Sequence, residues 1–401
     1  MPASLSELLA FGLTGSPWPW VVAWFLVVIQ LTIHAVSLYL HRSATHRGVD
    51  FHPALAHAFR FWTWLTTGMV TKEWVAIHRK HHARCETDGD PHSPVVHGIG
   101  TILWHGVALY QDACKDRAMV ARYGIGTVDD WIERNLYARW SSLGPTVMLF
   151  IDLALFGAVG LVVWALQMLW IPVIAAGVIN GLGHWWGYRN FETADRATNL
   201  VPWGIVIGGE ELHNNHHAFP SSAKFALRKW EFDSGWALLR LFEAVGLAKV
   251  IRIAPPLAVR PNIALPDADT VRAVLAHRFH VMTSYYRLVL RPALEQERRT
   301  AGESMDRLTR RLRKALANDG RWLDEVARAR LGAWVAERPS MQVLVEHRRR
   351  LGAAMERSGR NSQAMLESLQ AWCTDAERSG IATLEQFART LRGYALAPAR
   401  A

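Results

Sequence analysis

The chain has 401 residues, a formal net charge of +10 and 50% hydrophobic residues, including 19 Trp, with 18 His and 3 Cys. This hydrophobic content excludes an intrinsically disordered protein, and so many tryptophans are typical of proteins at a membrane–water interface. The three cysteines, Cys85, Cys114 and Cys373, are far apart, so neither a disulfide framework nor a thiolate metal cage is predicted. Any metal chemistry is therefore expected from histidine.

Lys and Arg are missing from two stretches, residues 1–40 and 141–187. The first contains an apolar run, residues 18–40, that reaches about 34 Å as a helix and is long enough to cross a bilayer core. Basic residues are abundant after each stretch, and the positive-inside rule places the segments that follow in the cytoplasm. The sequence therefore predicts an integral protein of the cell inner membrane.

The second basic-free stretch contains an apolar run that is too long for one span. It fits two spans, at about 143–164 and 168–187, with a turn near Gln167–Pro172. The resulting fold class is all-α: a membrane helical bundle with a cytoplasmic histidine-rich cap and a C-terminal helical extension.

Three regions follow from these patterns. Residues 1–250 form the membrane domain, residues 251–270 a Pro-rich connector, and residues 271–401 a cytoplasmic helical region with many charges and no long apolar run.

The candidate chemistry lies in three histidine clusters. They are His41 and His46 in an H-x4-H pattern, His78, His81 and His82 in an H-x-x-H-H pattern, and His213, His216 and His217 in a second H-x-x-H-H pattern. Neutral imidazole suits Fe, Zn and Cu, and eight imidazoles are too many for a mononuclear site, so a dinuclear site is predicted. On an α-helix His41 and His46 point about 140° apart, so one must lean inward or the helix must end there.

The clusters can share one site only if they lie on the same side of the membrane. Residues 53–70 separate the first two clusters and contain His57 and Arg60, which argue against a lipid-exposed span. We therefore expect this segment to be interfacial or re-entrant. The predicted hairpin at 143–187 crosses the membrane an even number of times and returns the third cluster to the same side.

The order of these clusters resembles that of the integral-membrane fatty-acid desaturases, most of all the acyl-CoA delta-9 (stearoyl-CoA type) desaturases, including bacterial members with C-terminal tails. The resemblance covers about residues 18–240. The matching strings are HRSATH (41–46), EWVAIHRKHH (73–82), ETDGDPHSP (86–94), NGLGHWWGYRN (180–190) and GEELHNNHHAFP (209–220).

The resemblance implies a di-iron centre whose ligands are the eight clustered histidines together with His184, and with Asn180 acting through a water molecule. It implies O₂ as co-substrate and a cis double bond, at delta-9, in a long-chain saturated acyl-CoA during unsaturated fatty acid biosynthesis. The acids and the histidine that flank the last two clusters are candidates for orienting the imidazoles: Glu86, Asp88, Asp90, His92, Glu210 and Glu211.

Electrons must come from another protein, because the sequence has no dinucleotide-binding glycine motif, no iron–sulfur cysteine set and no fused haem motif. A ferredoxin, a rubredoxin or a flavin reductase is the expected donor. Other expected partners are membrane lipid and the acyl-CoA, whereas nucleic acid is not expected. Trp74 is a candidate for lining an acyl tunnel. Candidates for CoA phosphate contacts are Arg42, Arg79, Lys80 and Arg189.

Three alternatives remain open from the sequence. One is an acyl-lipid desaturase, and a second is a histidine-box hydroxylase acting on an alkane, a sterol or a carotenoid. A third is a histidine-lined metal transporter, which is disfavoured because such sites lie on the spans near the bilayer midplane.

Overall fold

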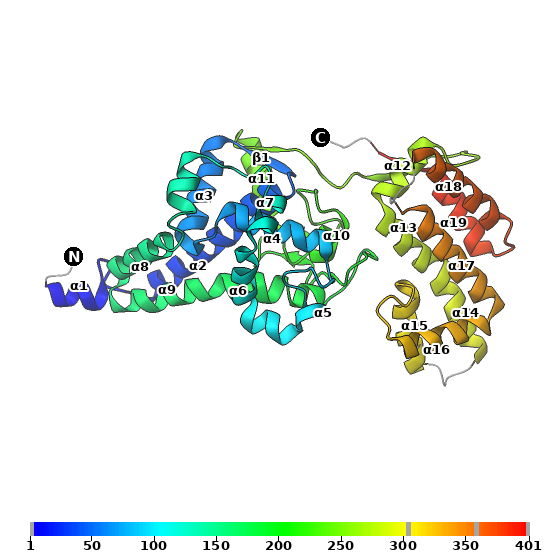
Figure 1. Ribbon diagram of the computed structural model, residues 1–401, viewed down its shortest axis with the longest axis horizontal. Helices are drawn as coiled ribbons and strands as arrows, with labels where there is room; N and C mark the ends of the chain where they lie inside the picture. Colours follow the sequence, from blue (N-terminus) through cyan, green and yellow to red (C-terminus); the bar gives the residue numbers. More distant parts are fainter. Residues whose placement is uncertain (1–3, 302–305, 357–360, 398–401) are drawn as a thin grey trace. The chain divides into compact units, whose positions relative to one another are not determined.

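The computed structural model describes residues 4–301, 306–356 and 361–397. It divides into two compact units (Figure 1). The N-terminal unit comprises Met1–Arg189 and Thr193–Ala254, and the C-terminal unit comprises Asn190–Glu192 and Pro255–Ala401.

The N-terminal unit is mostly helical, with two small two-stranded sheets, antiparallel β1–β4 and parallel β2–β3. Its elements are α1 (Leu5–Phe11), α2 (Trp18–Ala35), the π-helix η1 (Val36–Thr45), β1 (Val49–Phe51), α3 (Pro53–Thr67), α4 (Thr71–Arg84), α5 (Pro94–His97), α6 (Ile99–Lys115), α7 (Arg117–Tyr123), the π-helix η2 (Glu133–Tyr137), α8 (Leu143–Phe156), α9 (Ala158–Ile171), the π-helix η3 (Pro172–Ile179), the 3₁₀-helix η4 (Leu182–His184), β2 (Trp203–Gly204), α10 (His213–Ala218), β3 (Phe232–Asp233), α11 (Ser234–Ala244) and β4 (Ala248–Val250).

Two helices of the described chain are long and apolar enough to cross a membrane, Trp18–Thr45 and Ala158–His184, and a shorter apolar helix spans Leu143–Phe156. The hairpin predicted in this region exists, but its turn lies at Gly157 and not near Gln167–Pro172. Gly157 has a φ of 57°, and a Cβ atom there would meet the backbone of α1. The proline does not end the helix, because the chain continues through it as π-helix η3.

Helix α3 explains how an arginine can sit within an apolar segment. Arg60 is buried, and its guanidinium donates to Asp130 at 2.7 Å and to Glu133 at 3.0 Å. The helix ends at Gly68 in the left-handed conformation and packs against α2 and α8. The charge of Arg60 is thus neutralised inside the protein, and the interfacial or re-entrant position of this segment stays a prediction.

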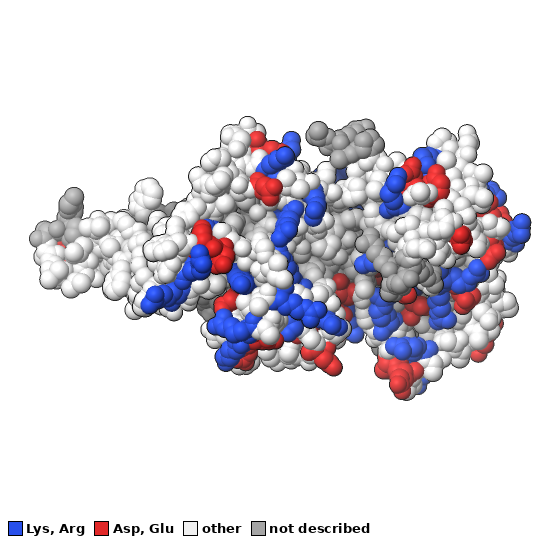
Figure 2. Space-filling model, turned by 45° about the horizontal axis from the view of Figure 1, so that its top comes forward, with Lys and Arg blue, Asp and Glu red and all other residues white. Residues whose placement is uncertain are grey.

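The outer surface of α1, α2, α8 and α9 is apolar. In Figure 2 the end of the N-terminal unit that carries α1 is almost free of coloured charged residues. Large exposed side chains there include Leu9, Trp18, Leu26, Phe150 and Leu161. A continuous exposed apolar surface of this kind is expected to contact lipid.

The C-terminal unit consists of helices around a core of its own, with β5 and β6 paired antiparallel. Its elements are β5 (Leu257–Val259), α12 (Ala268–Ala276), α13 (Arg278–Tyr285), the π-helix η5 (Tyr286–Leu290), α14 (Arg291–Ala301), α15 (Asp306–Ala317), α16 (Glu325–Ala336), α17 (Pro339–Ala354), α18 (Ser362–Glu377), α19 (Ala382–Arg392) and β6 (Tyr394–Leu396).

Trp372, Tyr285 and Phe387 are fully or nearly fully buried at the centre of this core, with their rings at steep angles to one another. The predicted connector, residues 251–270, is more ordered than its prolines suggested. It contains β5, which pairs with the last strand, and α12 begins within it at Ala268, where the Asp267 carboxylate accepts from the Thr270 N–H.

Candidate metal centre

The three histidine clusters and His184 come together inside the N-terminal unit. They are carried by η1 and the residue after it, by α4, by η4 and by α10. His46 and His82 are half-buried, and the other seven imidazoles are buried. Four segments far apart in the sequence therefore supply one histidine cluster.

Five imidazoles form a first group, whose ligand nitrogens all lie within 4.8 Å of one another. This five-histidine group consists of His41, His46, His78, His82 and His216. The Nε2 atom of His216 lies 3.0 Å from that of His41 and 2.9 Å from that of His82, and the Nε2 atoms of His78 and His82 are 3.1 Å apart. The ring nitrogens thus point toward a common centre.

A second group with the same spacing consists of His81, Cys85, His184 and His217. His213 adjoins it, because its Nε2 atom lies 3.0 Å from Nε2 of His184, and its ring centroid lies 4.5 Å from that of His217. The nine histidines expected as ligands therefore lie in or beside two adjacent groups.

The π-helical form of η1 brings His41 and His46 side by side. A π-helix has i→i+5 hydrogen bonds, so residues five apart are neighbours, unlike in an α-helix. The His46 N–H donates to the His41 carbonyl at 3.1 Å, and the two ring centroids are 5.0 Å apart. The angular mismatch expected for an α-helix is removed in this way.

Each H-x-x-H-H motif contributes to both groups. On α4, His78 and His82 join the five-histidine group while His81 joins the second group. Residues four apart share a helix face, whereas adjacent residues point about 100° apart. The same rule separates His216 from His217 on α10.

Four imidazoles donate their Nδ1–H group to a carboxylate. His41 donates to Glu210 at 2.8 Å, and His81 donates to Asp90 at 2.9 Å. The other two pairs are His184 with Glu86 at 3.3 Å and His217 with Asp195 at 3.0 Å. A carboxylate on Nδ1 fixes the tautomer in which Nε2 carries a free lone pair, which is the form that binds metal.

Burial also keeps the imidazoles neutral. Desolvation lowers the pKa of His81 and His216 well below the usual range, and neighbouring imidazoles lower both further. The pKa values of His78, His82, His213 and His217 are lowered in the same direction for the same reasons. Neutral imidazole is the form required of a metal ligand.

The donor set fits a pair of metal ions. Nε2 of His46 and Nε2 of His217 are buried with no hydrogen-bond partner in the described part of the chain. Buried polar atoms are rarely left without a partner, and a metal ion would supply one. Imidazole-rich sites of this kind suit iron, zinc or copper.

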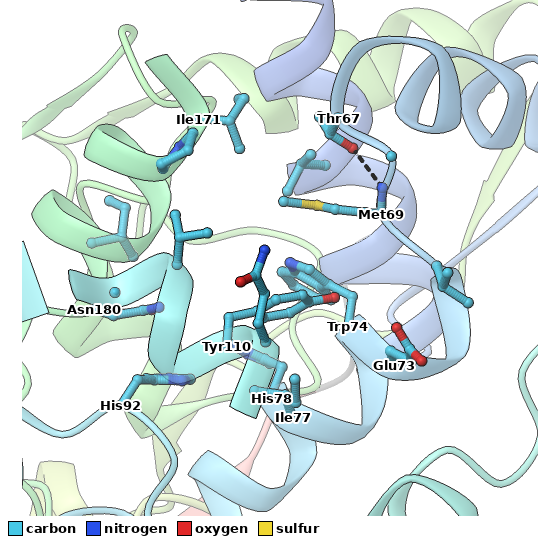
Figure 3. Close-up of a pocket in the computed structure, with 18 of the residues that line it drawn as sticks. Thr67, Met69, Glu73, Trp74, Ile77, His78, His92, Tyr110, Ile171 and Asn180 are labelled. Carbon is cyan, nitrogen blue, oxygen red and sulfur yellow. Dashed lines mark hydrogen bonds between the residues drawn. The ribbon is translucent and has the colours of Figure 1, made fainter. Parts of the chain in front are cut away.

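A cavity of about 570 Å³ opens beside the histidines (Figure 3). His41, His78 and His213 form part of its wall, and the expected lining residue Trp74 stacks on His78 with ring centroids 5.1 Å apart. Much of the remaining wall is apolar, including Ile33, Val36, Ile77, Met168, Ile171 and Ile174. The cavity thus joins an apolar space to the metal-binding groups.

Asn180 lines the same cavity, where Figure 3 shows it on the same side as His92. Asn180 lies four residues before His184, but the two do not share the face of one α-helix, because η3 ends at Ile179, Asn180 lies in a turn and η4 is a 3₁₀-helix. Its action on a metal through water stays a prediction.

Three of the arginines that were expected to contact CoA phosphates are instead bound to groups of the protein itself. Arg42 is 1% exposed and donates to both carboxylate oxygens of Asp233. Arg79 donates to four backbone carbonyls, and Arg189 donates to the carbonyls of a loop at residues 193–197. These guanidinium groups hold loops together, whereas Lys80 is half-buried and its role stays a prediction.

Two cations at the cavity and one carboxylate were not singled out from the sequence. Lys115 and Arg117 line the cavity with side chains that are 77% and 75% exposed, each paired with an acid. Asp195, which holds His217, lies in an irregular loop, so no helical or strand periodicity could have indicated it.

Comparison with known proteins agrees with this geometry. A family model described as fatty acid desaturase matches residues 17–240. The chain belongs to the fatty acid desaturase family, and it is an oxidoreductase of lipid metabolism.

Relatives include an Arabidopsis thaliana protein named as a probable chloroplastic lipid desaturase, ADS3.2, with 31% identity over 58% of this chain and 63% of the relative. The chain thus spans less than two thirds of that relative's length. The Arabidopsis thaliana delta-9 acyl-lipid desaturase 2 is 31% identical over 65% of this chain and 83% of its own. The acyl-CoA 5-desaturase AL21 of Anemone leveillei is 28% identical over 59% of this chain and 74% of the relative.

A second family model, described as a transposase, matches residues 262–397 in the C-terminal unit. It covers a minor part of the chain and is a similarity of that unit alone. The expectation that nucleic acid does not bind stays a prediction, and this unit is the place to test it.

Proposed function

We propose that this protein is an O₂-dependent di-iron desaturase that introduces a cis double bond at delta-9 of a long-chain saturated acyl-CoA. One observation carries the proposal: two adjacent groups of neutral, carboxylate-oriented imidazoles border an apolar cavity. When bound, the iron pair would supply the oxidising power, drawn from O₂, to remove hydrogen from an unactivated methylene chain.

The five-histidine group would hold one iron, and His81, His184, His213 and His217 the other, with Asn180 acting through water. The carboxylates of Asp90, Glu86, Glu210 and Asp195 keep the imidazole lone pairs directed inward.

The cavity would orient the acyl chain and exclude water from it. Trp74 and Ile77 flank His78 and would hold the methylene groups against the metal pair (Figure 3). The overall reaction balances when one O₂, two electrons and two protons are consumed, with a CH₂–CH₂ unit becoming CH=CH and two water molecules leaving.

The exposed cations Lys115 and Arg117 support CoA as the carrier, because they stand where the cavity reaches solvent and are paired only with partly or fully exposed acids. Exposed ion pairs contribute little and exchange readily for a phosphate. An acyl-lipid substrate is the second candidate, since two of the three relatives are named for lipid substrates.

The electrons would come from a separate ferredoxin, rubredoxin or flavin reductase. We place the metal centre and residues 271–401 on the cytoplasmic side of the inner membrane, in keeping with the distribution of Lys and Arg. Residues 1–250 would form the complete desaturase domain.

The test is fatty-acid analysis by gas chromatography–mass spectrometry after expression in a host, with derivatisation of double bonds and a His216→Ala control. We expect a new cis-monoene with the bond at carbon 9 that is absent from the control. A hydroxylated product would instead assign the protein to the histidine-box hydroxylases. Assays of the purified protein with acyl-CoA and with phospholipid vesicles decide the carrier.

A further inference from the structure

Cys85 lies within the second group although the sequence offered no cysteine pattern for metal binding. It follows α4 directly, four residues after His81, and its Sγ atom lies 3.8 Å from Nε2 of that histidine. Sγ and the ligand nitrogens of His81, His184 and His217 all lie within 4.8 Å of one another.

An independent observation points to a ligand at the same place. His217 is 5% exposed, and its Nδ1–H is held by Asp195 at 3.0 Å. Its Nε2 atom is buried and has no hydrogen-bond partner among the described residues. His217 belongs to the set around Cys85. Because Asp195 holds its Nδ1, Nε2 is the ring nitrogen left to meet a ligand there.

The two groups also differ in their number of nitrogen donors. The first group has five imidazoles, whereas the second has three, or four when the adjoining His213 is included. A sulfur donor would give the second position a ligand of a chemical kind that the five-histidine group lacks. Thiolate is a strong ligand for iron and for zinc, and it forms readily beside a divalent ion.

We propose that Cys85 is a sulfur ligand of the second metal position. This inference rests on the proposed function, in which that position holds iron. On coordination the Sγ–H bond breaks, the proton leaves to water, and one Sγ–metal bond forms with no change of oxidation state. The thiolate lowers the charge of the site by one and makes the two metal positions chemically distinct.

X-ray absorption of the purified, metal-loaded full-length protein tests the proposal directly. We expect a sulfur neighbour at about 2.3 Å from the metal, the distance typical of metal–thiolate bonds, at one sulfur per two metal ions. With Co²⁺ in place of iron, we expect a thiolate-to-cobalt charge-transfer band. Cys85→Ser should lose both signals, whereas Cys373→Ala, in the core of the C-terminal unit, should keep them.

The outcomes separate this inference from the proposed function. Two bound metal ions with only nitrogen and oxygen neighbours in the unaltered protein would overturn the role of Cys85 and leave the desaturase proposal intact. Failure of the unaltered protein to bind metal would overturn both. Because the decisive spectrum is that of the unaltered protein, the conclusion does not depend on whether Cys85→Ser folds.

Discussion

Replacing Asp90 with asparagine tests whether the carboxylates orient the imidazoles for metal. Asp90 is 2% exposed, and its carboxylate accepts from Nδ1 of His81 and from the backbone N–H groups of Glu86 and His92. Asparagine keeps one of these oxygens and replaces the other with an amide NH₂ group. One of the two backbone N–H groups then also loses its acceptor, because Glu86 donates to Oδ2 and His92 donates to Oδ1. The imidazole then loses the acceptor that holds its proton on Nδ1, and Nε2 is no longer fixed as a lone pair.

The size of the effect follows from the contact. Loss of a carboxylate behind a metal-bound histidine typically lowers metal affinity about 10- to 100-fold, or about 1.4–2.7 kcal/mol. Asp90→Ala should be worse, because two buried N–H groups would then lose their acceptor at about 1–3 kcal/mol each. Asp90→Asn therefore disturbs the loop less than Asp90→Ala does, and the thermal unfolding of the metal-free protein measures that part of the effect.

The assay is a chelator competition that follows metal content, with thermal unfolding of the metal-free protein measured in parallel. Asp88→Asn is the matched control, because this neighbouring acid is exposed and lies in the same loop. We expect the control to retain metal and Asp90→Asn to release it at a lower chelator concentration. Unchanged affinity in Asp90→Asn would refute the orienting role of the carboxylate.

Four other predictions follow from the structure. His81→Ala and His216→Ala should each abolish iron loading and desaturation, whereas His57→Ala, on the exposed face of α3, should not; full activity in either cluster variant would contradict the site. Gln167 is a buried residue of α9 that lines the cavity, so Gln167→Ala should enlarge the cavity and shift the product profile toward longer chains, each further buried methylene contributing about 0.8 kcal/mol. An unchanged profile, the same as in the exposed control Leu166→Ala, would show that Gln167 does not limit the chain length. Arg60→Met leaves the Glu133 carboxylate buried and unpaired and should lower the free energy of unfolding by about 3–5 kcal/mol. Burial raises the pKa of Glu133 and Arg60 lowers it, so without Arg60 the carboxylate should protonate more readily, and the loss of stability should be largest at neutral pH and shrink on acidification. A difference in Tm that does not change with pH would contradict this reasoning. A chain truncated after residue 254 should still bind metal, because the C-terminal unit has a core of its own, and metal loss without misfolding would show otherwise. Salt-dependent binding of DNA to the full chain, lost on this truncation, would contradict the expected absence of a nucleic-acid partner.

The sequence alone identified much of the site. The H-x4-H and H-x-x-H-H patterns identified eight candidate ligands, and the number of clustered imidazoles predicted two metals. Such patterns are readable in the sequence because contacts three or four residues apart on a helix are local. Basic residues were less predictable: Arg42 was expected to meet a phosphate, but it is paired with Asp233 from a segment far along the chain.

Other features depended on contacts that no local pattern encodes. The turn at Gly157 is set by the close approach of α1, and the π-helical η1 realigns His41 with His46. Asp195 reaches His217 from an irregular loop. Each of these depends on two segments that are distant in sequence or on a departure from α-helical geometry.

The sequence by itself determined the apolar helices, the candidate metal-binding side chains and the family, because hydrophobic runs and histidine spacing are properties of short segments. Only the tertiary structure decided how nine histidines divide between two positions, which carboxylate orients each imidazole, and that Cys85 belongs with them. Metal coordination requires atoms to meet within a few ångströms, and only the packing of helices distant in sequence sets such distances.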